Sequence, residues 1–104
     1  MYCLTVSYPK SEQARFDFDY YQNSHLALVK EKFGPLGLQD ILLKQNIGVK
    51  PGDDSQCFAS VDLVFDSQES MKAALAAAGK AINADIVNYT DVQAQYSFGD
   101  FSRF

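Results

Sequence analysis

A single histidine, His25, is the side chain of this 104-residue sequence whose ordinary pKa lies closest to neutral pH. It ends the run FDFDYYQNSH, residues 16–25, which also contains Tyr20 and Tyr21. A histidine in a pocket is well suited to give or take a proton at pH 7. Tyr21 comes one helical turn earlier, near enough to orient the imidazole ring or to share its proton. We therefore take His25 and Tyr21 as candidate catalytic residues.

Each of these residues also has a purely structural interpretation. His25 lies on the apolar stripe of the expected helix, where a half-buried histidine bonded to a backbone carbonyl is more common than a catalytic one. Aromatic rings such as those of Tyr20 and Tyr21 belong to a core or an interface more often than to a ligand site. Asp17 and Asp19 are explained by the helix start that they mark. The functional hypothesis therefore concerns only the second half of the run.

Two residues outside this run are candidates for substrate binding, as is Tyr20. Asp62 interrupts an otherwise apolar segment, and a buried carboxylate requires a partner, so it could reach a pocket, a second copy of the chain or solvent. Tyr89 belongs to NADIVNYTD, residues 83–91, where turn formation by Asp and Asn is the more common explanation and pocket lining the less common one.

No metal and no cofactor are predicted. One histidine cannot supply a three-histidine centre, and the acidic turn PGDD, residues 51–54, has no histidine nearby. The sequence contains no GxGxxG, P-loop, GxSxG or HExxH motif. The residues by themselves indicate a pocket with one histidine and do not define its reaction.

The composition predicts one folded domain spanning residues 1–104. Hydrophobic residues make up 47% and charged residues 21%, well interspersed, which argues against disorder. A net charge of −4 without a cluster of lysine or arginine argues against nucleic acid as a partner. No leader-like or membrane-spanning apolar run is present, so we expect no membrane association and a cytoplasmic location. Cys3 and Cys57 are expected to be reduced thiols on opposite faces of the sheet.

Hydrophobic periodicity predicts the order strand, helix, strand, strand, helix, strand. Phe16 and Tyr21 are spaced as a hydrophobic staple around the first helix start. The expected strands are residues 2–8, 38–46, 56–65 and 90–98. The first expected helix begins at an Asp17 cap and ends at Gly34-Pro35. The second begins at an Asp66 cap, paired with Glu69, and runs through SQESMKAALAAAG, and a short helical piece is expected at 81–87.

This order is the α+β, ferredoxin-like β-α-β-β-α-β arrangement, with an antiparallel sheet, its first and third strands central and both helices on one face. The other face is expected to be mixed in character. A face of this kind is suited to pairing with a second copy around a partly polar cavity, so we expect a homodimer. The expected members of this face are Cys3, Thr5, Ser7, Ile41, Leu43, Phe58, Ser60, Asp62, Val64, Gln93 and Gln95.

Several runs of the sequence, in order over nearly the whole chain, resemble the EthD family. The resemblance implies a dimeric α/β-barrel of ferredoxin-like subunits, and it places the family's histidine at His25 and its paired tyrosines at Tyr20 and Tyr21. Many relatives have Met-Pro after the histidine, where this chain has Leu26-Ala27, and a proline where Val87 stands. The matching runs are YP (8–9), ARFDFDYYQNSHLALV (14–29), GP (34–35), PG (51–52), LVFDSQES (63–70) and ADIVNYTDV (84–92).

The family takes its name from a gene cluster for the degradation of ethyl tert-butyl ether, where its member accompanies an oxygenase system. Fungal relatives resemble decarboxylases and dehydratases, and neighbouring barrel families include cofactor-free monooxygenases. The resemblance implies a small-molecule enzyme or accessory protein that acts on a hydrophobic or aromatic metabolite, by cofactor-free oxidation or by a proton-transfer lyase step at His25. The alternatives are a non-catalytic binder or carrier that assists a partner oxygenase, and a sheet face that only forms a dimer and encloses nothing.

Overall fold

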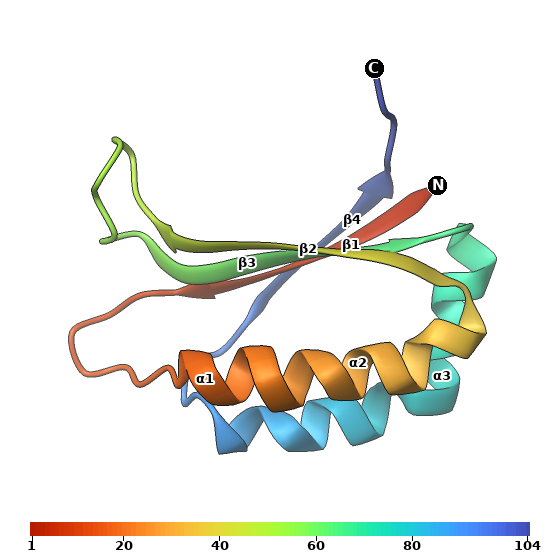
Figure 1. Cartoon of the computed structure of the whole chain (residues 1–104), viewed down its shortest axis with the longest axis horizontal. Coiled ribbons are helices and arrows are strands. Elements are labelled where there is room, and N and C mark those ends of the chain that lie inside the picture. Colours follow the sequence, from red (N-terminus) through yellow and green to blue (C-terminus); the bar gives the residue numbers. More distant parts are fainter.

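The computed structural model describes all 104 residues and contains one four-stranded antiparallel sheet with helices on one face (Figure 1). The strand order is β2-β3-β1-β4, so the first and third strands are central. This confirms the predicted α+β, ferredoxin-like fold. The strands are β1 (Tyr2–Pro9), β2 (Leu38–Ile47), β3 (Cys57–Phe65) and β4 (Gln95–Asp100).

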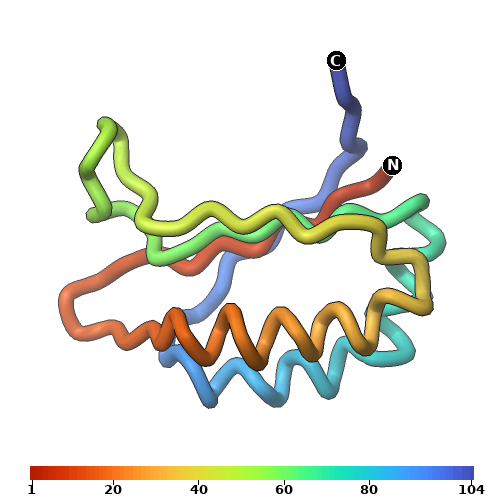
Figure 2. Tube along the Cα trace, viewed as in Figure 1, coloured from red at the N-terminus to blue at the C-terminus, as the bar shows by residue number.

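Two helical rods lie side by side beneath the sheet (Figure 2). The first rod is continuous from Phe18 to Phe33 but contains a π-helical turn in its middle. The second rod is the α-helix α3. The helical segments are α1 (Phe18–Tyr20), the π-helical turn Tyr21–His25, α2 (Leu26–Phe33), the 3-10 turn Gly34–Leu36, α3 (Gln68–Asp85) and the 3-10 turn Ile86–Asn88. None of the helices combines the length and the apolar character needed to cross a membrane.

The start of the first rod follows the prediction, whereas the start of α3 does not. The Asp17 side chain accepts a hydrogen bond from the Tyr20 backbone N–H, as an N-cap should, and the staple between Phe16 and Tyr21 brings their ring centroids to 5.1 Å. In α3 the N-cap is Ser67, whose side chain accepts a hydrogen bond from the Ser70 N–H. The expected Asp66 cap was wrong by one residue, because serine caps a helix as well as aspartate does.

The C-terminal third of the chain also departs from the prediction. The helix α3 continues through Gly79 to Asp85 instead of breaking before residue 81, because its alanine-rich sequence outweighs the roughly 1 kcal/mol that one glycine costs a helix. The last strand begins at Gln95, five residues later than expected. Before it, Thr90 makes only an isolated bridge with Phe16.

The pairing of β2 with β3 corrects two of the predicted positions. Ile41 lies opposite Leu63 and Leu43 opposite Val61. Leu63 and Val61 belong to the core that faces the helices, so Ile41 and Leu43 lie on the helix face and not on the open face. Side chains alternate along a strand, and an error of one residue in the register reverses the face of every side chain. Leu42, opposite Asp62, is the apolar residue that β2 places on the open face.

Phe58 was also assigned to the wrong face. The pairing of β1 with β3 shifts between Tyr8 and Pro9, next to this residue. Such a bulge reorients a side chain. The Phe58 ring stacks on Phe16, with ring centroids 5.3 Å apart, and belongs to the core between the sheet and the helices.

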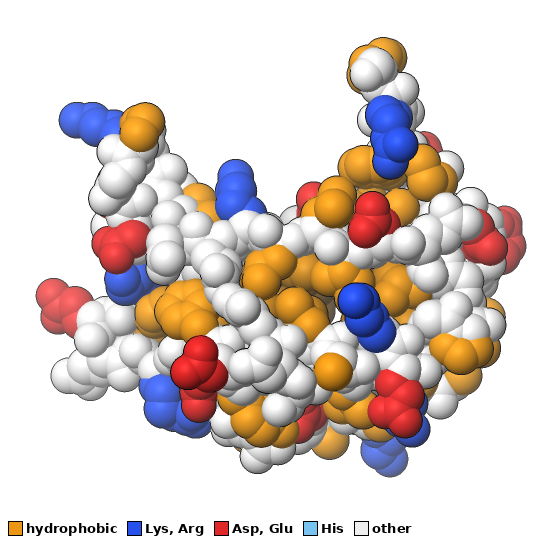
Figure 3. All heavy atoms as spheres, viewed as in Figure 1, with side chains coloured by type: hydrophobic (Ala, Val, Ile, Leu, Met, Phe, Trp, Pro, Cys, Tyr) orange, Lys and Arg blue, Asp and Glu red, His pale blue; other side chains and the backbone are white.

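The open face of the sheet is mixed in character, as expected: the polar side chains of its central strands are half-buried, Cys3 and Val64 are buried, and Leu42 is exposed. The Thr5 hydroxyl donates to the Asp62 carboxylate over 2.7 Å, and the Ser7 and Ser60 hydroxyls are bonded at 3.1 Å. The loop between β2 and β3 and the C-terminal segment both extend on this side (Figure 1). In the space-filling view they border a broad hollow (Figure 3). Both cysteines are free.

Candidate functional site

The π-helical turn Tyr21–His25 places both candidate catalytic side chains in the interior. The buried residues of this rod are Tyr21, His25, Val29 and Phe33, each four positions after the last. In a regular α-helix, residues four apart drift by about 40° around the axis, because 3.6 residues complete one turn. A wider turn offsets part of this drift. Turns of this kind occur often at functional sites, and the hydrophobic pattern did not predict this one.

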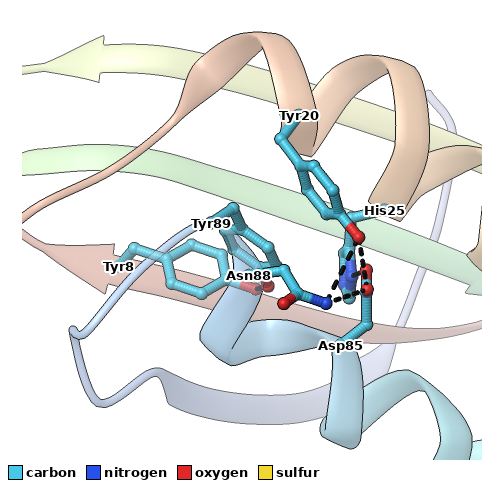
Figure 4. A network of polar contacts seen from close by, with 6 residues as sticks. All are labelled: Tyr8, Tyr20, His25, Asp85, Asn88 and Tyr89. Atoms are coloured by element: carbon cyan, nitrogen blue, oxygen red, sulfur yellow. Dashed lines mark hydrogen bonds and ion pairs between the residues drawn. The ribbon is translucent and has the colours of Figure 1, made fainter.

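His25 forms a hydrogen bond with Asp85 at the end of α3 (Figure 4). The distance from the imidazole Nδ1 to Asp85 Oδ2 is 2.9 Å, and the two side chains are only 5% and 15% exposed. The other carboxylate oxygen, Oδ1, accepts hydrogen bonds from the Tyr20 hydroxyl at 2.6 Å and from Asn88 Nδ2 at 2.9 Å. Three donors therefore hold the carboxylate that orients the histidine.

Burial and hydrogen bonding together set the charge of this pair. Burial lowers the pKa of His25 below its ordinary value of 6.5, and Asp85 opposes this shift only in part. Burial would raise the pKa of Asp85, but hydrogen bonds from Tyr20, Asn88 and His25 outweigh it and lower the pKa below 3.8. At pH 7 the imidazole is therefore neutral and the carboxylate is ionised. Because a carboxylate only accepts, Nδ1 carries the proton and Nε2 keeps a lone pair.

A cavity of about 70 Å³ lies between the sheet and the helices, and His25 lines it. Thirteen of its sixteen lining residues are hydrophobic, and none is Lys, Arg, Asp or Glu. Asp85 stands outside the cavity, and Nε2 has no hydrogen-bond partner in the protein. The arrangement thus presents a neutral base to an apolar space.

A cluster of three tyrosines lies beside His25. The Tyr21 ring stacks on the imidazole ring with centroids 5.6 Å apart, the Tyr89 ring lies 4.6 Å from the imidazole, and Tyr8 packs against both of these tyrosines. The hydroxyls of Tyr8 and Tyr89 share a hydrogen bond of 2.7 Å, whereas the Tyr21 hydroxyl is buried near Tyr8 and has no partner at hydrogen-bond distance. Burial raises the pKa of all three phenols, so each keeps its proton at pH 7 and can donate it to an acceptor.

The structure gathers four of the five predicted site residues and separates the fifth. Tyr20 and Tyr89 contact Asp85 and His25, respectively, but neither lines the cavity that His25 and Tyr21 line. Asp62 lies on the open face, bonded to Thr5, on the opposite side of the sheet from the cavity. The expectation that Asp62 shares a pocket with His25 was therefore wrong, because the pocket lies on the helix side.

The residues that the sequence interpretation missed are Asp85, Asn88 and Tyr8. Asp85 is 60 positions from His25, and its place among turn-forming residues gave a sufficient structural explanation. One signal could have identified it, because the run ADIVNYTDV that carries the family resemblance contains both Asp85 and Asn88. No group of three or more His, Cys, Asp and Glu side chains is close enough to hold a metal ion.

Solved structures with high similarity share this architecture. An EthD-like protein from Ralstonia eutropha JMP134 is 30% identical, with a TM-score of 0.85 over 95% of this chain and 89% of the other. An EthD family protein from Bacillus halodurans C-125 is 25% identical, with a TM-score of 0.75 over 98% of this chain and 99% of the other. A dimeric ferredoxin-like protein from an uncultured marine organism, 12% identical, has a TM-score of 0.61 over 100% and 98% of the two chains and shows the fold alone.

Sequence comparisons give the same family. No functionally curated protein matches the chain. The sequence profile of the EthD domain matches residues 10–93, which include His25, Tyr20, Tyr21 and the segment around Asp85. Since this match covers most of the chain, the protein belongs to the EthD family.

Proposed function

We propose that the protein is an EthD-type small-molecule enzyme that binds a hydrophobic or aromatic metabolite in the cavity and moves a proton to or from it at His25. One observation carries the proposal: a buried imidazole that lines an apolar cavity is held through Nδ1 by Asp85 and has no hydrogen-bond partner at Nε2. A base whose pKa lies below neutral pH is unprotonated and ready to act at pH 7.

The neighbours of His25 have separate tasks in this mechanism. Asp85 fixes the tautomer and stabilises the imidazolium that forms when Nε2 takes a proton. Tyr20 and Asn88 hold the Asp85 carboxylate in position. The apolar walls exclude water and so strengthen these electrostatic interactions. Proton transfer is the reaction class that these groups support directly, and it is the first step of either a lyase reaction or a cofactor-free oxidation.

The tautomer of His25 is the direct test of this proposal. His25 is the only histidine, so its ring nitrogens give isolated signals in ¹⁵N NMR spectra. We expect the Nδ1–H tautomer at pH 7. The Nε2–H tautomer would contradict the proposal, because no lone pair would then face the cavity.

Catalysis can be tested with a simple ketone probe. Cyclohexanone in D₂O exchanges the protons next to its carbonyl when a base removes them, and ¹H NMR measures the rate. His25→Asn keeps an N–H donor near the Nδ1 position and deletes Nε2. We expect it to lower the protein-catalysed rate by at least about 100-fold, the lower range for a general base. Equal rates for the two proteins would contradict a role for Nε2.

The alternative function is a binder or carrier that assists a partner oxygenase, favoured by the mostly apolar lining of the cavity. It requires the cavity but no proton transfer. The two functions differ in their dependence on pH. An enzyme that uses His25 loses activity as pH falls through the lowered pKa of that residue, whereas binding of a neutral apolar ligand stays nearly constant.

We also propose that two copies associate through the open face of the sheet to form the homodimeric barrel. The half-buried Thr5–Asp62 pair and the exposed Leu42, at 44%, lie on this face, and one structural neighbour is described as dimeric. Light scattering should give twice the 11.6 kDa chain mass. A monomer at micromolar concentration would contradict the proposal.

A further inference from the structure

Two residues that line the cavity each carry a polar group without a hydrogen-bond partner in the protein. His25 Nε2 is the acceptor, and the Tyr21 hydroxyl, 0% exposed as a residue and without a partner, is the donor. The two rings are stacked, which brings the two residues together in the cavity wall. A buried polar group without a partner costs about 1–3 kcal/mol, which a ligand that bonds to it would recover.

The charges around the cavity favour a neutral ligand. No charged Lys, Arg, Asp or Glu side chain lines it, and the Asp85 carboxylate lies behind the imidazole ring. A carboxylate ligand would lose its hydration without gaining an opposite charge, and it would face the field of Asp85. A neutral ligand meets neither penalty.

The size of the cavity limits the ligand to about one ring. Its volume of about 70 Å³ is roughly half the volume of a cavity known to hold benzene, about 150 Å³. Expansion is possible at Tyr96, which lines the cavity and is 52% exposed. A six-membered ring therefore requires a modest opening, and a fused polycyclic compound would require the sheet and the helices to separate.

Gly79 indicates where the body of the ligand lies. It is in the middle of α3, where glycine costs about 1 kcal/mol relative to alanine, and it lines the cavity. An added Cβ would meet only the Leu75 side chain, at 3.8 Å, which is ordinary contact. Packing within the protein thus does not require glycine here. Space for a ligand in the cavity would explain why residue 79 is a glycine.

We propose that the ligand is a neutral hydroxyl compound with one ring, either a phenol or the enol of a cyclic ketone. Its hydroxyl donates to His25 Nε2 and accepts from the Tyr21 hydroxyl, and its ring extends toward Gly79. In the proton transfer, the ligand O–H bond breaks, its electron pair stays on oxygen and an N–H bond forms at Nε2. Asp85 stabilises the imidazolium, and the Tyr21 hydroxyl stabilises the phenolate or enolate. The inference rests on the proposed role of His25.

Binding of three probes of similar size tests the inference. Phenol can both donate and accept, anisole can only accept, and benzoate is an anion. In calorimetric titrations of the wild-type protein at pH 7.5 we expect phenol to bind at least tenfold more tightly than anisole and benzoate to bind most weakly. Equal binding of phenol and anisole, tighter binding of benzoate, or no binding of phenol would overturn the inference.

Two variants assign the ligand contacts. Tyr21→Phe should weaken phenol binding about tenfold, equivalent to about 1.4 kcal/mol. His25→Asn should make phenol and anisole bind alike. Tyr2→Phe, on the same sheet but outside the cavity lining, serves as the control and should leave all three affinities unchanged. Retention of the preference for phenol in His25→Asn would overturn the inference, and circular dichroism of each variant verifies that it is folded.

Gly79→Ala tests the position of the ring. It should raise the melting temperature while weakening phenol binding, whereas Gly34→Ala, at a helical glycine with open space around it, should leave binding unchanged. Unchanged phenol binding in Gly79→Ala would refute the proposed orientation.

The outcomes also separate this inference from the proposed function. Cyclohexanone exchange without phenol binding overturns the inference alone, and phenol binding without exchange overturns the enzymatic function alone.

Discussion

Replacement of Asp85 by asparagine should move the proton of His25 from one ring nitrogen to the other. The Asp85 carboxylate accepts three hydrogen bonds, two at Oδ1 from Tyr20 and Asn88 and one at Oδ2 from His25 Nδ1. An asparagine can keep the first two bonds through its oxygen, and its NH₂ group then faces His25. Two donors cannot bond to each other, so Nδ1 must become an acceptor. The imidazole proton therefore moves to Nε2 and blocks the lone pair in the cavity.

The expected effects on activity and on stability differ in size. All hydrogen bonds are retained in the new arrangement, but bonds to a charged group become neutral ones, a loss of about 1 kcal/mol in the free energy of unfolding. For a domain of about 100 residues this corresponds to a melting temperature lower by roughly 4–8 °C. Loss of the base should lower cyclohexanone exchange by at least about 100-fold. In serine proteases, the equivalent change produces the wrong tautomer and lowers kcat about 10⁴-fold.

The ¹⁵N spectrum of the His25 ring measures the tautomer directly in the Asp85→Asn protein. Asp91→Asn is the matched control: this carboxylate lies in the same segment but accepts from the Arg15 backbone N–H, away from His25. The control should retain the wild-type tautomer and exchange rate. If Asp85→Asn kept the Nδ1–H tautomer, with Asn88 and Tyr20 reversing their hydrogen bonds instead, the orienting role assigned to the carboxylate would be refuted.

Three further predictions concern stability, the tyrosine hydroxyls and assembly. Folding lowers the pKa of His25 below 6.5 and that of Asp85 below 3.8, so the unfolded chain binds more protons just below each of these values. The free energy of unfolding from urea titrations should therefore be highest above pH 6.5, decrease as the pH falls below 6.5, and decrease again below pH 3.8. His25→Asn should lack the first decrease. Tyr21→Phe should stabilise the protein by about 1 kcal/mol because it deletes an unpartnered hydroxyl, and Tyr89→Phe should destabilise it by a similar amount because it removes the hydrogen bond to Tyr8. Changes of the opposite sign in urea titrations would contradict the assigned hydrogen bonds. Leu42→Lys on the open face should shift the light-scattering mass toward the monomer without changing exchange of cyclohexanone, and an unchanged dimer would place the interface elsewhere.

The element order and the pairing of the central strands could be predicted because they depend on local periodicity and on topology rules. The face of β2 could not be predicted in the same way. LQDILLKQN has apolar residues at three successive positions, Ile41, Leu42 and Leu43, so alternation alone does not decide which of them points inward. Pairing with β3 decides it, and that contact is made between strands.

The candidate site shows the same division between local and distant information. His25 and Tyr21 could be identified because an unusual residue type and a helical spacing are visible in a short run. Asp85 could not be assigned as the partner of His25, because an aspartate at a helix end has an adequate local explanation and the pairing depends on how the two helical rods pack. Asp62 was misplaced for a related reason, since an interrupted apolar strand does not reveal which side of the sheet holds the cavity.

The position of the cavity between the sheet and the helices determines the stoichiometry of the site. His25, Asp85 and the cavity walls all come from one chain, and the open face lies on the other side of the sheet. Each copy in a dimer would therefore contain a complete site, and the two sites would work independently. In hybrids of wild-type and His25→Asn chains, activity should fall in direct proportion to the fraction of mutant chains.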